Sequence, residues 1–384
     1  MTYLRLVAGC RVMKAIVPRQ EFQEALSAVA TLTGGRTTKE ILRCVRLSAE
    51  QAGLELGATD GEAALRLSVA GASVVAAGQT VVVAERLLGI VRELADAEVS
   101  LDADEKYCVI RGERSEFRVF VAAAADFPPL PSFDDEPNFV LDGNELRRMV
   151  ELTLYAAARE TSRYAINGVL WEKQGKRLYM VATDGRRLAR AAGGVEQAEG
   201  EDFEAIVPSK ALGVFERVFI APRDGSDWAV QVKIMPNQVL VRSGARLLST
   251  VLVEGHFPRY DDVIPKGSNK RARLDRAEFH AAVRRAALLT TEDSRAVRLS
   301  FNEERLEITS QSPEQGDARV EMPITYEGEP VDIGFNPAFL SDALKAVPFD
   351  EVFFDMEESF RPGVLTGGEK RDFLYVVMPV SLGS

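Results

Sequence analysis

The chain has 384 residues, of which 46% are hydrophobic and 27% are charged, with a formal net charge of −11 at pH 7. This composition is ordinary for a soluble globular protein, and the length allows about two to four domains with separate cores. No apolar run reaches the roughly 18–20 residues that span a bilayer, so we expect no membrane partner.

The sequence has few of the residues and motifs that enzymatic catalysis or metal binding requires. It has only two histidines, His256 and His280, and three cysteines without a CxxC pair. The GxxxxGK[ST], GxGxxG, GxSxG and HExxH patterns are all absent. We therefore expect no catalytic residue, no metal and no cofactor, and the unpaired cysteines favour a reducing cytoplasm.

The first third of the chain, residues 13–136, follows a short stretch, residues 1–12, that we interpret as an extension. It opens on the amphipathic pattern RQEFQEALSAV and continues with ATDGEAALR at 58–66. The segment VVVAERLLGIVREL at 81–94 comes next, and the proline-rich ADFPPLP at 125–131 closes it.

The middle third, residues 137–266, repeats this order. A helix is predicted where Leu146, Met149, Val150 and Thr153 fall at i, i+3, i+4 and i+7. The strands GVLWEK, RLYMVAT and RRLARAA follow, with turns at Gln174-Gly175 and Asp184-Gly185. Asp-Gly is typical of a two-residue hairpin loop because glycine tolerates positive φ. A second helix is predicted over 209–219.

The last third, residues 267–384, has the same helix spacing in Phe279, Ala282, Val283 and Ala286. Asp142…Glu145 and Asp275…Glu278 both match a capping box at the start of these helices. We interpret Phe133–Pro137 and the basic stretch Lys266–Arg273 as linkers.

Three landmark pairs show that the first two thirds are copies of one unit, and Glu278 and Pro337 mark the corresponding places in the last third. Glu21 and Glu145, Thr59 and Thr183, and Ala84 and Pro208 are separated by the same number of residues. The third copy lacks the Asp-Gly turn and is the most divergent. Mixed helices and antiparallel strands indicate an α+β fold in three tandem domains, 13–136, 137–266 and 267–384.

Two other classes of protein remain open from the residues alone. Asp60 and Asp184 could be the paired acids of a carboxylate-based hydrolase. They occupy equivalent places in two copies, however, as turn residues should. A structural or adhesive repeat protein would normally have shorter repeats of about 20–50 residues.

The net negative charge of the chain by itself argues against nucleic-acid binding. The charges are not evenly spread along the sequence, however, so the net value does not settle this question. The predicted helices are rich in basic residues, while acidic residues such as Asp134, Asp135 and Glu136 cluster in predicted loops. The helix charges are either ordinary solvated faces or phosphate contacts, which would have no sequence preference.

Seven phrases, in order, resemble the β sliding clamp of bacterial DNA polymerase III. They are MKAIVPRQEF, AADFPPLP, RYAINGVLWE, VATDGRRLA, HFPRYDDVIP, FNPAFLSDAL and YVVMPVSL. The resemblance runs from Met13 to Leu382. It implies three DNA-clamp-fold domains, each with two helices and antiparallel sheets, and a head-to-tail dimer forming a six-domain ring. It also implies a non-catalytic processivity factor that encircles duplex DNA and tethers the polymerase.

The resemblance further implies a peptide pocket between the second and third domains. Carried over by position, it comprises Ile166, Thr183, Gly185, Arg187, Leu188, Pro258, Val263, Val376, Met378, Pro379 and Val380. Aliphatic and Met side chains suit an adaptable apolar cleft. Ala165, Arg186 and Asp262 depart from the family pattern at the rim of this pocket, and Pro362 and Gly363 are unusual near it.

The same resemblance implies the remaining contacts. The ring contact would place Phe117 and Val119, on an edge strand, against Leu288 and Leu289. The DNA contacts would be Arg36, Arg147, Arg148, Arg159, Lys210, Arg284 and Arg285. The implied partners are double-stranded DNA without sequence preference, the polymerase III catalytic subunit, the clamp loader, and other polymerases and repair proteins. The implied location is the cytoplasm, at the nucleoid during replication.

Overall fold

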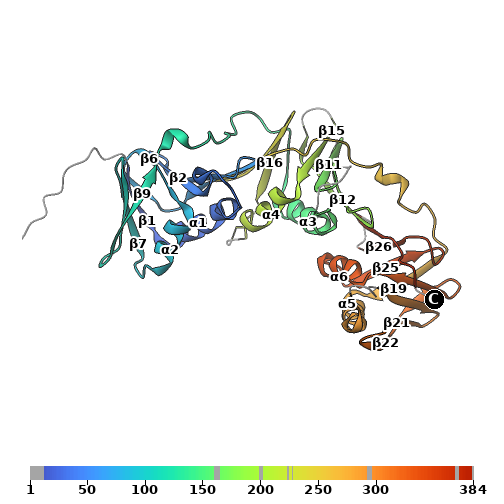
Figure 1. The fold of residues 1–384 in the computed structure, drawn as a ribbon. Helices are drawn as coiled ribbons and strands as arrows, with labels where there is room; N and C mark the ends of the chain where they lie inside the picture. Colours follow the sequence, from blue (N-terminus) through green and yellow to red (C-terminus); the bar gives the residue numbers. More distant parts are fainter. Residues whose placement is uncertain are drawn as a thin grey trace, which may run out of the picture. The chain divides into compact units, whose positions relative to one another are not determined.

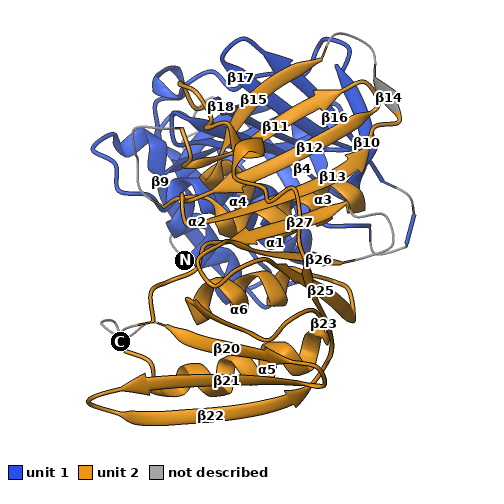
Figure 2. Ribbon diagram, turned by 90° about the vertical axis from the view of Figure 1, so that its right-hand side faces the viewer, with its two compact units in different colours: residues 1–143, 213–252 blue, residues 144–212, 253–384 orange. Residues whose placement is uncertain are grey.

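The computed structural model describes residues 13–159, 165–198, 202–222, 225–226, 228–291, 296–367 and 372–382. The chain divides into two compact units (Figure 2). Unit 1 combines residues 1–143 with 213–252, and unit 2 combines residues 144–212 with 253–384. The expected extension at residues 1–12 lies outside the described residues, and the expected limits of the three domains stay a prediction.

The helices follow the predicted order, two in each third of the chain. They are α1 (Arg19–Thr33), α2 (Ala84–Glu93), α3 (Gly143–Thr153), α4 (Ser209–Val218), α5 (Arg276–Ala286) and α6 (Pro337–Ala346). Helices α1 and α2 pack side by side in unit 1, and α5 and α6 do so in unit 2 (Figure 1).

The predicted apolar faces of α3 and α5 are confirmed. Leu146, Met149, Val150 and Thr153 are fully buried, as are Phe279, Ala282, Val283 and Ala286. Asp275 caps α5 as predicted, because its carboxylate accepts a hydrogen bond from the Glu278 amide at 2.8 Å. Burial of one stripe of a short helix supplies most of the stability that its intrinsic propensity lacks.

In unit 1 the strands form one antiparallel sheet in the order β10-β16-β17-β18-β4-β3-β2-β6-β9-β8-β7-β1-β5. Their bounds are β1 (Met13–Pro18), β2 (Cys44–Glu50), β3 (Gly53–Thr59), β4 (Ala63–Val69), β5 (Ser73–Ala76), β6 (Gly78–Val83), β7 (Glu98–Ala103), β8 (Tyr107–Arg111), β9 (Glu116–Ala122), β10 (Phe139–Asp142), β16 (Ala229–Met235), β17 (Gln238–Ser243) and β18 (Arg246–Val251). Helix α1 packs on β3 and β4.

In unit 2 a nine-stranded sheet runs β15-β11-β12-β13-β27-β26-β25-β19-β23, and a second sheet runs β22-β21-β20-β24. Their bounds are β11 (Gly168–Gln174), β12 (Arg177–Thr183), β13 (Arg187–Gly194), β15 (Phe203–Pro208), β19 (Lys270–Asp275), β20 (Val297–Asn302), β21 (Arg305–Ser312), β22 (Gly316–Pro323), β23 (Thr325–Glu327), β24 (Val331–Phe335), β25 (Glu351–Met356), β26 (Gly363–Gly367) and β27 (Phe373–Val377). The short β14 (Gln197–Ala198) also falls in this unit.

Two sequence expectations need correction. The basic stretch Lys266–Arg273 is not wholly a linker, because β19 begins at Lys270 and pairs with both β23 and β25. Nor do Asp184 and Gly185 form the two-residue loop. Asp184 pairs with Arg187, N to O at 3.4 Å, and Gly185 and Arg186 are the two loop residues. Asp60 is likewise one place earlier than expected, opposite Ala63.

Candidate functional site

The pairing of β13 with β27 arranges side chains from distant parts of the sequence in two neighbouring rows. Side chains two residues apart on a strand share a face, and registered partners lie side by side. The first row is Leu188, Val376 and Val364, and the second is Arg190, Leu374 and Thr366. Both rows lie on the same face of the nine-stranded sheet.

An apolar cavity of about 220 Å³ lies over the first row. It is lined by Ile166, Thr183, Gly185, Arg187, Leu188, Pro258, Arg259, Tyr260, Val263, Val376 and Met378. Leu188 and Val376 form its buried floor, each 2% exposed, whereas Val263 and Met378 are 49% and 41% exposed. Apolar side chains of this size are exposed together at few places on a soluble protein, so the cavity is a candidate binding site.

The structure brings nine of the proposed pocket residues to this cavity, and Pro379 and Val380 are not among its lining residues. The Val380 amide instead donates to the Gly334 carbonyl at 2.9 Å, which holds the C-terminal segment against β24. Sequence reasoning missed Arg259 and Tyr260, although both fall inside the quoted phrase HFPRYDDVIP.

Tyr260 anchors the loop that forms one wall of the cavity. Its hydroxyl donates to Glu172 Oε2 at 2.6 Å. Burial and this bond to a carboxylate raise the pKa of the Tyr260 hydroxyl, so it stays protonated. Its ring packs against the apolar cluster around Leu188 and Val364. The loop is thus held by one polar and one apolar contact.

Arg187 also lines the cavity, and its side chain is 10% exposed. Its guanidinium donates to Asp184 Oδ2 at 3.0 Å, to Asp342 Oδ2 at 2.7 Å and to the Tyr155 carbonyl at 2.8 Å. The guanidinium also lies 4.5 Å from the Phe339 ring centroid. Burial alone would lower the pKa of Arg187. The hydrogen bond to Asp342 and the neighbouring carboxylate of Asp184 nevertheless hold the pKa of Arg187 above its ordinary value. Arg187 is therefore a fixed cation.

Asp184 has a local structural role. Its Oδ1 accepts from the amides of Arg186 and Arg187 at 3.0 and 3.1 Å. Asp60 does the same for Glu62 and Ala63 at 2.9 and 2.8 Å. An aspartate that accepts from amides two and three residues ahead stabilises a turn. The same bonds in both copies explain why both turns keep an aspartate.

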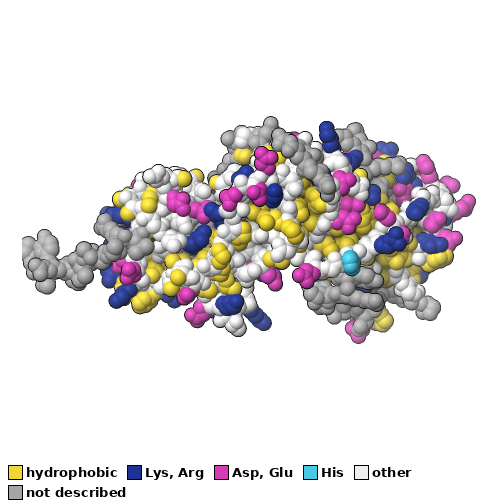
Figure 3. All heavy atoms as spheres, turned by 90° about the horizontal axis from the view of Figure 1, so that it is seen from above, with side chains coloured by type: hydrophobic (Ala, Val, Ile, Leu, Met, Phe, Trp, Pro, Cys, Tyr) yellow, Lys and Arg dark blue, Asp and Glu magenta, His cyan; other side chains and the backbone are white. Residues whose placement is uncertain are grey.

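The proposed DNA contacts differ in their surroundings. Arg147 pairs with Glu151 at 2.9 Å, and Arg148 pairs with Glu145 at 2.7 Å while also donating to the Ala192 carbonyl at 3.0 Å. The side chains of Arg36, Arg159, Lys210, Arg284 and Arg285 are exposed. On the face shown in Figure 3 basic and acidic side chains are interspersed, so the charges there do not form one field.

The proposed ring-contact residues lie on two surfaces. Leu288, in the single turn Ala287–Leu289 after α5, is 75% exposed. Phe117 on β9 is 37% exposed, whereas Val119 is buried at 6%. Strand β9 pairs with β8 along Glu116–Phe120 but with β6 only at Val121 and Ala122. Among the described strands, the first part of β9 is thus a free edge.

Metal binding and membrane insertion find no support within the described ranges. No group of three or more His, Cys, Asp or Glu side chains there is placed to hold a metal ion. In the same part of the chain, no helix is long and apolar enough to cross a membrane.

The similarity to known proteins extends over nearly the whole chain. Family models for the N-terminal, central and C-terminal domains of the DNA polymerase III beta subunit match residues 13–131, 140–259 and 261–381. The beta sliding clamp of Escherichia coli strain K12 is 33% identical over 371 residues, covering 96% of this chain and 100% of that protein.

Solved structures agree with these matches. A sliding clamp (DNA polymerase III subunit beta) from Pseudomonas aeruginosa bound to griselimycin has a TM-score of 0.89 at 30% identity, covering 97% of this chain and 100% of that one. The sliding clamp of Bacillus subtilis has a TM-score of 0.90 at 24% identity with the same coverage, and supports the fold alone.

The fold and these matches define the class of protein, a sliding clamp that acts as a processivity factor in DNA replication and is not an enzyme. The chain belongs to the DNA polymerase III β subunit family. DNA and a DNA polymerase are therefore its partners. The hydrolase alternative finds no support, in keeping with the turn roles of Asp60 and Asp184.

Proposed function

We propose that two copies of this chain close head-to-tail into a ring around duplex DNA and that the apolar cavity docks short segments of replication proteins. The observation that best supports docking is the cavity itself, where the partly exposed Val263 and Met378 stand over the buried pair Leu188 and Val376. Its volume of about 220 Å³ is below the roughly 300–1,000 Å³ of sites that enclose whole drug-sized ligands. It therefore suits one or two anchoring side chains, such as Leu or Phe.

The proposed segments come from the polymerase III catalytic subunit, the clamp loader, and other polymerases and repair proteins. All of them would use the same apolar cavity in turn. We place this activity in the cytoplasm, at the nucleoid during replication.

The ring contact would join the free edge of β9 on one protomer to the surface around Leu288 on the next. An unpaired strand edge is a template for another strand. Leu288 is 75% exposed, and burial of a leucine side chain is worth about 1.5–3 kcal/mol, so a protomer that covers it would gain from the contact. Phe117 would also contribute to this contact. Val119 would contribute less, because it is buried within its own protomer.

Retention on DNA would be topological, with weak phosphate contacts. Arg36, Arg159, Lys210, Arg284 and Arg285 support such contacts by their exposure. Arg148 supports them least, because Glu145 and the Ala192 carbonyl already use its guanidinium. Phosphate contacts fix no sequence, so the clamp can slide.

Retention on closed and linear DNA tests this proposal. The clamp is loaded on nicked circular DNA with its clamp loader, and half of the sample is linearised by a restriction enzyme before gel filtration. The expected result is coelution with the circle and loss from the linear DNA. Equal retention on both forms would show that binding is not topological.

A further inference from the structure

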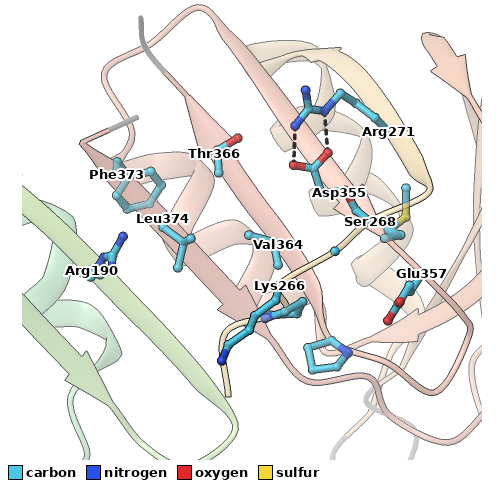
Figure 4. Close-up of a pocket in the computed structure, with 14 residues that line it drawn as sticks. Arg190, Lys266, Ser268, Arg271, Asp355, Glu357, Val364, Thr366, Phe373 and Leu374 are labelled. Carbon is cyan, nitrogen blue, oxygen red and sulfur yellow. Dashed lines mark hydrogen bonds and ion pairs between the residues drawn. The ribbon is translucent and has the colours of Figure 1, made fainter. Parts of the chain in front are cut away.

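A second cavity, of about 350 Å³, lies on the same face of the sheet as the apolar cavity. Figure 4 shows the residues that line it. Leu374, Val364 and Thr366 line it, together with the segment Pro265–Ser268. Val364 lies opposite Val376, which lines the apolar cavity, in the register of β26 and β27. The two cavities are thus neighbours across one strand pair.

Two cations stand on one side of this second cavity. Arg190 comes from β13 and Lys266 from the loop before β19 (Figure 4). Within the described residues neither has an ion-pair partner, and the Arg190 guanidinium lies 5.9 Å from the Tyr179 ring centroid. By contrast, Arg271 is neutralised by Asp355, with contacts of 2.5 and 2.8 Å. We call this cavity, lined by Arg190 and Lys266, the basic annex.

The annex also contains Glu357, but Figure 4 shows its side chain across the cavity from Arg190 and Lys266. Among the residues that line the cavity, the charged groups on that side are therefore the cations Arg190 and Lys266. Arg190 is half-buried, and a guanidinium with reduced access to water gains from a carboxylate that offers charge-assisted hydrogen bonds. An acidic group is the chemistry that fits this side of the annex.

The spacing of the two rows determines how many residues would separate the acidic residue from the apolar anchor in a docked segment. Leu188 and Arg190 are two residues apart on β13 and point to the same face, so their side chains are separated by about 7 Å. An extended segment advances about 3.3 Å per residue, so a segment anchored over Leu188 reaches Arg190 after about two or three residues.

We propose that the basic annex binds the carboxylate of an Asp or Glu about two or three residues from the apolar anchor of the docked partner segment. This proposal rests on the proposed docking function of the apolar cavity. In this proposal Arg190 and Lys266 provide the selectivity between partner segments that share the same apolar anchor.

Matched fluorescent peptides test the annex on the full-length clamp. Each peptide has a Leu-Phe anchor and one variable residue, Glu, Gln or Lys, placed two or three positions away on either side. Dissociation constants are measured by fluorescence anisotropy. For one placement the wild type should bind the Glu peptide about fivefold more tightly than the Gln peptide, as expected for a partly exposed ion pair.

Charge variants locate the effect. Arg190→Gln and, separately, Lys266→Gln should each reduce the ratio between the Glu and Gln peptides, and Arg190→Glu should favour the Lys peptide. Arg305→Glu changes the net charge by the same amount as Arg190→Glu, but at a residue of β21 that lines neither cavity, and should keep the wild-type ratio. Thermal melting checks that each variant is folded, and the exposed Lys266 is the variant least expected to disturb folding.

The outcomes separate the two proposals. Equal binding of the Glu and Gln peptides by the wild type at every placement would overturn the annex, as would a ratio that survives in the Arg190→Gln Lys266→Gln double variant. Failure of all three peptides to bind would overturn the apolar cavity as the docking site, and the annex with it.

Discussion

Arg187 donates to the Asp342 carboxylate, Nη1 to Oδ2, at 2.7 Å and so joins the start of β13 to helix α6. The pair is asymmetric, because the Arg187 side chain is 10% exposed and that of Asp342 is 48% exposed. The wall of the apolar cavity is therefore held by a buried cation that also contacts Asp184 and the Tyr155 carbonyl.

This asymmetry predicts unequal costs for removing the two partners. Arg187→Ala should lower the free energy of unfolding by about 2–3 kcal/mol, because it leaves several acceptors without their donor and removes packing against Phe339. Asp342→Ala should cost less than about 1 kcal/mol, since Asp184 still pairs with Arg187 and Asp342 is largely solvated. Urea denaturation measures both, and equal losses would contradict this account.

The apolar cavity predicts that Met378→Lys weakens binding of a Leu-Phe peptide more than tenfold while leaving the melting temperature unchanged. Met378 is 41% exposed, so a lysine there can reach water but places a charge over the apolar floor. Met235→Lys, at a 39% exposed methionine in unit 1, is the matched control and should bind normally. Unchanged affinity in Met378→Lys would move the docking site elsewhere.

Leu188→Lys is a poorer test of the same site. Leu188 is 2% exposed and packs with Val181, Ile206 and Val376. A lysine there would bury a charge, so we expect loss of stability together with loss of binding.

The turn geometry predicts opposite effects for one substitution at two glycines. Gly185 has φ +84°, and no other atom lies within 4 Å of the place that a β-carbon would take, so Gly185→Ala should cost about 1–2 kcal/mol from backbone strain alone. Gly89, inside α2 and equally uncrowded, should gain about 0.5–1 kcal/mol on Gly89→Ala. Chemical denaturation measures both, and stabilisation at Gly185 would disprove the turn assignment.

The proposed ring predicts a particle of about twice the chain mass of 42.1 kDa in light scattering. Leu288→Asp should give monomers at micromolar concentration, because it places a charge in the proposed contact. Val75→Asp changes a residue of β5 that is 57% exposed and should leave the dimer intact. A monomeric wild type at the same concentration would exclude the ring.

The hydrogen bonds of the Asp104 carboxylate lead us to expect a small change in stability at acid pH. Its Oδ1 accepts from the amides of Lys106 and Tyr107, both at 2.7 Å. These bonds lower the pKa of the Asp104 carboxyl in the folded state. Its contribution is therefore complete above the unfolded pKa of about 4 and is lost as pH falls through the lower folded value.

Asp104→Asn should accordingly be less stable than the wild type at pH 6 and should approach it as the pH falls below about 4. The free energy of unfolding is measured by urea denaturation along this pH series. A difference from the wild type that grows on acidification would contradict the assignment.

Local features of this protein were predictable from the sequence because they depend on neighbours along the chain. The buried faces of α3 and α5 follow from the 3.6-residue period, and the cap at Asp275 follows from the spacing to Glu278. The sequence predicted a turn at each Asp-Gly pair but placed the loop one residue too early, because the aspartate side chain accepts from amides ahead of it and so precedes the loop.

The cavity residues were proposed from a family resemblance, and periodicity alone could not have assembled them. A period of two indicates that Leu188 and Arg190 share a face of β13, but it does not say which strand lies beside them. The pairing of β13 with β27 decides that Val376 and Leu374 are the neighbours.

The sequence by itself determined the repeated units, their helices and turns, and the family. Only the tertiary structure decided that Tyr260 and Arg259 join the cavity and that Arg190 and Lys266 meet in a second one beside it. The physical reason is that contacts between distant strands depend on the packing of the whole sheet, whereas helix faces and turns depend on residues a few positions apart.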